Sequence, residues 1–114
     1  MLINGVELVV NMFDADFSDK YEKAFLDMKQ GEQDIPQDAT LGDIIRQQCA
    51  LAAKLFDDLF GAGTAKAIIR GKSDLREHLD AIELLLEEVS TQAQQANTRL
   101  SKYSPNRAAR RKAK

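Results

Sequence analysis

The stretch LREHLDAIELLLEEVSTQAQQANTRLSKY, residues 75–103, decides the fold of this chain. Its apolar residues recur at alternating steps of four and three, the 3.5-residue repeat typical of helices that pack along a seam. A helix over the whole stretch is about 43 Å long at 1.5 Å per residue. Because a chain of 114 residues does not cover that length, we expect part of the seam to meet another surface. The seam positions are Leu75, Leu79, Ile82, Leu86, Val89, Ala93, Ala96, Leu100 and Tyr103.

The two halves of this helix differ in the size of their apolar side chains. Leu84 and Leu85 widen the stripe in the first half, which we expect to pack on a second helix over residues 40–60. In the second half the apolar stripe narrows, because its side chains at residues 93 and 96 are alanines, and two helices can approach closely there. Self-association through this half and folding back within the subunit both remain open. The candidate partner-binding residues here are Ala93, Ala96, Leu100 and Tyr103.

The second helix has its own start and stop signals. Thr40 and Asp43 form a Thr-x-x-Asp start, and Gly61 follows the last apolar residue. The broad apolar stripe between them predicts the central core helix. Its members are Leu41, Ile44, Ile45, Cys49, Ala52, Leu55, Phe56, Leu59 and Phe60.

Two shorter helices complete the helical part. Residues 64–69 predict a short helix, after which Gly71 can take the left-handed conformation of a helix end. Residues 16–30 predict a first helix, and Gly31 is placed to stop it. The apolar residues of this first helix recur at helical spacing. They are Phe17, Tyr21, Ala24, Phe25 and Met28.

A hairpin opens the chain. Asn4-Gly5 supplies the positive φ angles of a two-residue hairpin turn. Two strands alone are marginal in water, so Val6, Leu8 and Val10 on one face need a helix or a partner chain to cover them.

The expected fold class is therefore mainly α. It consists of an N-terminal β-hairpin over about residues 1–12, a small helical bundle, the long heptad-patterned helix and a basic tail. The length of 114 residues fits a single domain over residues 1–103 and a flexible tail over residues 104–114. A single cysteine cannot form an internal disulfide, no apolar run is long enough to span a bilayer, and the N-terminus has no basic leader region. We expect a protein of a reducing, intracellular compartment without membrane contact.

Charge is distributed unevenly along the chain. All 18 Asp and Glu lie at or before Glu88, and the same part of the chain contains 9 of the 16 Lys and Arg. The other basic residues are Arg99, Lys102, Arg107, Arg110, Arg111, Lys112 and Lys114. A basic tail of this kind can neutralise phosphates, dock on an acidic protein surface or fold back on its own acidic body. Nucleic-acid binding would rest on Lys and Arg with Tyr103 as the nearby aromatic, so we rank it below protein docking.

Two motifs that suggest ligand binding lack essential residues. Gly71-Lys72-Ser73 matches the end of a phosphate-binding loop, but Lys66 stands where the first glycine belongs. A calcium-loop pattern begins at Asp14, but Asp19 and Phe25 replace its glycine and its bidentate glutamate. We therefore expect neither nucleotide hydrolysis nor a calcium site.

Catalytic groups are also sparse. Cys49 and His78 are single residues on different predicted helices, and we interpret Cys49 as a small buried residue and His78 as half-exposed beside the seam. Adjacent carboxylates such as Asp57-Asp58 diverge by about 100° on a helix, so they are typical of a solvated face. We expect no enzyme, no cofactor and no metal.

Three stretches of the chain carry a family resemblance. The stretches are Ile3 to Leu8 with Asn11 to Asp16 and Tyr21-Glu22, Leu59 to Thr64 with Gly71 to Leu75, and Tyr103 to Arg111. Together they resemble small tail-morphogenesis proteins of phages and prophages of Gram-positive bacteria. The last of them is similar to the basic Asn-Arg-x-x-Arg-Arg endings of tail assembly chaperones of long-tailed, noncontractile phages.

This resemblance implies a non-enzymatic helical protein in the cytoplasm of the bacterial host cell. Such a chaperone binds the tape-measure and tail-tube proteins before the tube polymerises and is absent from the finished virion. Arg107, Arg110 and Arg111 would contact an acidic partner, and residues 75–103 would support a homo-oligomer. Two rival functions remain: a structural or minor tail component of the virion, and a small nucleic-acid-binding protein that uses the basic tail.

Overall fold

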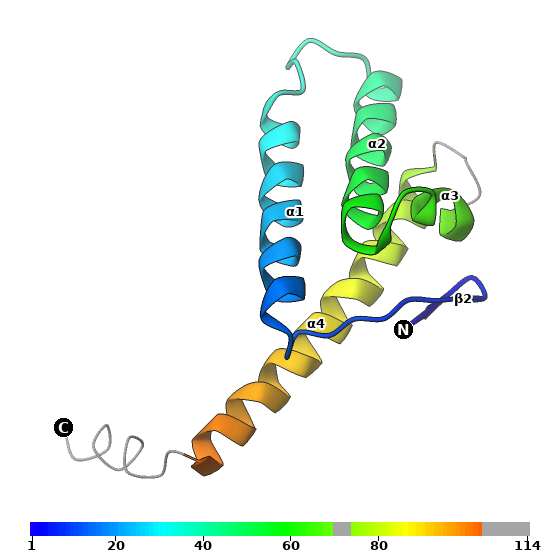
Figure 1. Ribbon diagram of the computed structural model, residues 1–114. Helices are drawn as coiled ribbons and strands as arrows, with labels where there is room; N and C mark the ends of the chain where they lie inside the picture. Colours follow the sequence, from blue (N-terminus) through cyan, green and yellow to red (C-terminus); the bar gives the residue numbers. More distant parts are fainter. Residues whose placement is uncertain (70–73, 104–114) are drawn as a thin grey trace, which may run out of the picture.

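A computed structural model describes residues 1–69 and 74–103 of the chain. In order, its elements are β1 (Leu2–Ile3), β2 (Val6–Glu7), α1 (Ala15–Gln33), α2 (Leu41–Phe60), α3 (Thr64–Ile69) and α4 (Leu75–Tyr103). The predicted class is confirmed, because a short antiparallel hairpin is followed by helices (Figure 1). Gly71 and the tail over residues 104–114 lie outside the described residues.

α1 and α2 form an antiparallel helical hairpin, and α2 begins at the predicted Thr40 cap (Figure 1). The side chain of Asp14 accepts a hydrogen bond from the backbone N–H of Phe17, and that of Thr40 accepts one from Asp43. Each cap satisfies a backbone donor that the first helical turn leaves unpaired. The Arg46 guanidinium donates to the Asp43 carboxylate at 2.7 Å and lowers its pKa below the usual value.

Gly31 does not stop α1, contrary to the prediction. The helix continues to Gln33, and the position where a Cβ of residue 31 would stand is occupied by the side chain of Leu51. The glycine therefore lets α2 approach α1 closely, and packing outweighs its low helix propensity.

The N-terminal hairpin has the predicted Asn-Gly turn but shorter strands than expected. Asn4 and Gly5 have φ angles of 49° and 83°, and Ile3 pairs with Val6. The side-chain amide of Asn4 donates to the backbone carbonyl of Ile68, which ties the turn to α3. Leu8 is buried in the same core as α3 and α4, so the subunit itself covers this face of the hairpin.

The core lies where α2, α3, the N-terminal segment and the first half of α4 meet. Phe56, Ile68 and Leu85 are completely buried at its centre. Leu41 departs from the predicted stripe, because the first turn of α2 extends beyond the core and leaves this side chain exposed. Cys49 is buried, as predicted for a small apolar position. Burial raises the pKa of its thiol, and the negative charge of Asp74 raises it further.

α4 packs along a different line from the predicted seam. Ile82 and Val89 are buried as expected, but Leu79 and Leu86 remain largely exposed. The neighbouring Leu85 is buried in their place, because α2 contacts α4 on that side. A helix with one packed side can bury only a sector of its surface, so the rest of the seam stays on the outside.

His78 is buried rather than half-exposed, which corrects the sequence prediction. Its relative exposure is 5%, and its Nδ1 donates to the backbone carbonyl of Asp74 at 2.8 Å. This hydrogen bond gives a buried polar group the partner it requires at the start of α4.

Candidate protein-binding site

The end of α4 extends past the other helices. In Figure 1 the orange part of the helix continues beyond the lower end of α1 without a neighbouring helix. Leu100 is 64% and Tyr103 85% exposed, Ala93 is also exposed, and Ala96 is half-buried. Steps of three and four place these four side chains on one face of the helix. The structure thus brings the four predicted residues of α4 together on residues 93–103, the open end, which no other helix among the described residues covers.

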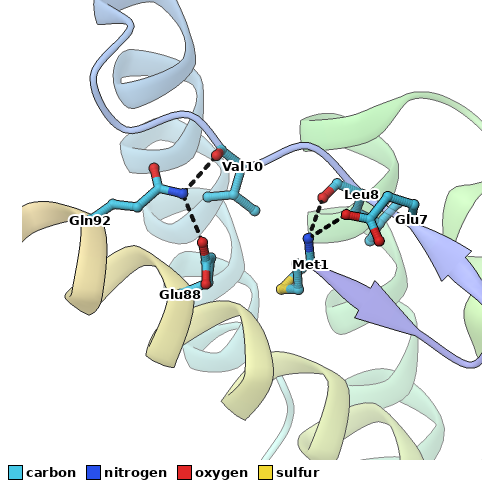
Figure 2. Close-up of polar contacts among 6 residues, drawn as sticks. All are labelled: Met1, Glu7, Leu8, Val10, Glu88 and Gln92. Atoms are coloured by element: carbon cyan, nitrogen blue, oxygen red, sulfur yellow. Dashed lines mark hydrogen bonds and ion pairs between the residues drawn. The ribbon is translucent and has the colours of Figure 1, made fainter.

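Gln92 marks where the covered part of α4 ends. Its side-chain amide donates to the carbonyl of Val10 and accepts from the N–H of Met12, both at 2.7 Å. The same amide also donates to Glu88 at 2.9 Å. Figure 2 shows the Gln92 side chain reaching Val10 and Glu88, with the ammonium of Met1 bound near Glu7 and Leu8. The N-terminal segment is thereby fixed across α4 immediately before the open end.

A polar groove lies beside the open end of α4. Its volume is about 570 Å³, and Phe13 forms one wall, with the Arg99 guanidinium 5.7 Å from the centre of the ring. A cation over an aromatic face at this distance is attracted by the ring. Lys102 lines the same groove with Thr and Gln side chains. The groove therefore offers two cations and hydrogen-bonding groups to a ligand.

Sequence analysis did not identify Phe13 as part of this surface. The residue precedes the Asp14 cap of α1, a position whose apolar side chain often packs on the fourth residue of its helix. That fourth residue is Ser18, which offers no apolar partner. The polar Ser18 was the available signal that Phe13 contacts another element.

α4 is electrically polarised from one end to the other. Five acids lie between Glu77 and Glu88, and Arg99 and Lys102 follow near the C-terminal end. Among the described residues, neither cation of the open end has a carboxylate within salt-bridge distance. The predicted contact residues Arg107, Arg110 and Arg111 lie outside the described residues.

The described residues provide few groups for metal binding or membrane insertion. Residues 1–69 and 74–103 contain no cluster of three His, Cys, Asp or Glu side chains that could hold a metal ion. None of the four helices combines the length and apolarity that crossing a membrane requires within the described ranges. What the open end offers is an apolar stripe, two cations and a polar groove, which together suit non-covalent binding of a polypeptide.

Comparison with known proteins identifies the family. Residues 4–114 match the model described as "Family of unknown function (DUF6673)", and the chain belongs to this family. No curated protein and no solved structure matches the chain.

Proposed function

We propose that this DUF6673 protein is a non-enzymatic phage tail assembly protein that acts in the cytoplasm of the bacterial host. It is a chaperone that binds the tape-measure and tail-tube proteins before the tube polymerises. The observation that carries the proposal is the open end of α4, where Leu100 and Tyr103 are exposed and which no other helix among the described residues covers. The identity of the clients, the tape-measure and tail-tube proteins, is inferred from the resemblance of the chain to tail assembly chaperones.

The chemistry of the open end suits a long helical client. Apolar side chains at steps of three and four can pack against a matching stripe on a tape-measure helix. Arg99 and Lys102 add positive charge beside the stripe, and the tail adds Arg107, Arg110 and Arg111. We expect the client segment to be apolar on one face and acidic beside it.

Co-expression with both clients tests the proposal. The chain is produced with the tape-measure and tail-tube proteins of its own locus, and complexes are isolated by pull-down and sized. We expect a complex that keeps a client from precipitating. Leu100→Glu should reduce capture at least about tenfold, because burying a leucine contributes about 1.5–3 kcal/mol.

A triple charge reversal tests the contribution of the tail. The variant Arg107→Glu, Arg110→Glu, Arg111→Glu should lose capture in low salt, since it replaces attraction to an acidic client by repulsion. A matched control reverses three exposed lysines that make no ion pair within the described residues and should capture normally. Its changes are Lys20→Glu, Lys29→Glu and Lys66→Glu.

Two results would contradict the chaperone function. Detection of the chain in purified particles would indicate a virion component. Failure to capture either client, together with nucleic-acid binding that falls steeply between about 50 and about 200 mM salt, would indicate a nucleic-acid-binding protein.

A further inference from the structure

Residues 1–69 and 74–103 leave an apolar strip on the side of α4 exposed along most of the helix. The strip consists of Leu79, Leu86, Ala93 and Leu100, which are seven residues apart and therefore share one heptad position. All four are exposed, whereas Ile82 and Val89 on the adjacent line are buried in the subunit. The strip is about 32 Å long at 1.5 Å per residue and spans three heptads, the lower end of the length at which such a sequence pattern indicates a coiled coil.

The charges of α4 favour one orientation for a paired helix. The first half of α4 is acidic from Glu77 to Glu88, and the described part of its second half carries only Arg99 and Lys102. Two parallel copies would place acidic halves side by side and basic halves side by side. Two antiparallel copies place each acidic half beside a basic half, which Coulomb attraction favours.

The side-chain sizes along the strip fit the same orientation. When two antiparallel strips are centred between residues 89 and 90, Leu86 faces Ala93 of the second copy and Leu79 faces Leu100 of the second copy. A large residue then opposes a small one in the two layers next to the centre, which favours close packing there, and the outer layers pair two leucines. The antiparallel arrangement also places the other helices of each subunit beside the open end of the second copy. The packed cores of the two subunits therefore lie at opposite ends of the pair.

We propose that the α4 strip binds a second copy of this chain in an antiparallel, two-fold arrangement centred between residues 89 and 90. This inference deepens the proposed function and rests on it in one respect: the second copy occupies Ala93 and Leu100 until a client replaces it. The pairing itself is a property of the chain alone. A seam of three heptads suits exchange, because it buries only a short apolar strip.

Single cysteines test the orientation in a Cys49→Ala background of the full chain. A disulfide requires Cα atoms within about 7 Å. In the antiparallel pair, the two copies of residue 90 lie about 1.5 Å apart along the axis, and those of residue 93 about 10 Å apart. We expect Ser90→Cys to form covalent dimers on mild oxidation and Ala93→Cys to remain monomeric on denaturing gels. Efficient linkage of Ala93→Cys would show parallel pairing and overturn the proposal.

Thr91→Cys controls for random collision, since residue 91 is exposed but lies on another face of α4. It should form no more covalent dimer than the Cys49→Ala parent after the same oxidation. Linkage of Thr91→Cys equal to that of Ser90→Cys would assign the disulfides to collision and would also overturn the proposal.

A matched pair of leucines tests the strip itself. Leu86 is 40% exposed and belongs to the strip, whereas Leu84 is 43% exposed and lies outside it. By sedimentation equilibrium we expect the chain to approach twice its mass of 12.7 kDa at high concentration. Leu86→Glu should raise the dissociation constant of this dimer at least about tenfold, and Leu84→Glu should leave it unchanged. Circular dichroism of both variants verifies that they fold.

The effect of salt and the behaviour with clients separate the remaining outcomes. Salt should weaken an antiparallel dimer, because it screens the attraction between the acidic and basic halves. A chain that stays monomeric at all concentrations but captures clients would overturn the pairing and leave the proposed function standing. A dimer with these properties that captures no client would support the pairing and contradict the proposed function.

Discussion

At the scale of single residues, Gln92 holds a long segment in place. Its amide pairs with the carbonyl of Val10 and the N–H of Met12, two backbone groups that would bond to a neighbouring strand in a sheet. One side chain from α4 therefore satisfies two backbone groups of the segment between β2 and α1. Because both backbone groups are partly buried, water cannot fully substitute for the amide.

The loss of Gln92 should destabilise the protein measurably. Gln92→Ala leaves one donor and one acceptor of the N-terminal segment without partners, and we expect a loss of about 1–3 kcal/mol in the free energy of unfolding. Gln94→Ala is the control, because Gln94 is exposed two residues further along α4. Urea titration of both variants measures the difference. Equal stability of the two variants would show that the Gln92 hydrogen bonds contribute nothing.

The buried thiol of Cys49 makes the free energy of unfolding depend on pH in the alkaline range. Burial raises the pKa of this thiol, so the unfolded chain releases its proton at lower pH than the folded chain does. The stabilisation is complete below the unfolded pKa of about 8.5 and is lost as pH rises through the folded value. Urea midpoints should fall more between pH 7 and pH 10 for the natural chain than for Cys49→Ala. An equal fall of the urea midpoint with pH in both proteins would show that ionisation of Cys49 does not cause the loss of stability.

At the scale of elements, the close approach of α1 and α2 depends on Gly31 and Leu51 together. Gly31→Ala adds about 1 kcal/mol of helix propensity but places a Cβ against the Leu51 side chain. In a Leu51→Ala background the space is open, so the same change should be stabilising there. A double-mutant cycle by urea unfolding should give a coupling energy above about 0.5 kcal/mol. Additive changes would show that Leu51 moves aside without cost.

The helices were largely predictable from local signals, whereas their packed sides were not. The Thr-x-x-Asp start and Gly61 predicted α2 nearly to the residue, because those signals act within a single turn, and the heptad pattern predicted the bounds of α4. Gly31 was misjudged, since its role comes from a contact 20 residues away on another helix. The heptad pattern gave the spacing of apolar residues on α4, but only the packing of α4 on α2 decides that Leu85 is buried and Leu86 is exposed.

The candidate site was predictable in the same limited way. The sequence indicated Ala93, Ala96, Leu100 and Tyr103 as candidates, because the heptad repeat can be counted along the chain and is longer than the rest of the subunit can cover. It could not place Phe13 beside Arg99, since that contact joins residues from opposite ends of the chain.

At the scale of the whole molecule, shape and charge follow the same axis. The longest dimension is 55 Å against 34 and 22 Å, and the helix over residues 75–103 supplies much of that length. Acidic residues belong to the body and the first half of α4, and the cations of the second half lie on the open end. This separation of charge along the long axis attracts an acidic partner to the open end and orients it as it approaches.

The anchoring of the N-terminal segment has a consequence for the order of events during synthesis. Met12 leaves the ribosome 80 residues before its partner Gln92. At about 5–20 residues per second, the segment waits roughly 4–16 s before its hydrogen-bonding partner exists. During that time Leu8 and Val10 lack the last helix that covers them. The beginning of this chain is therefore the part whose final structure is completed last.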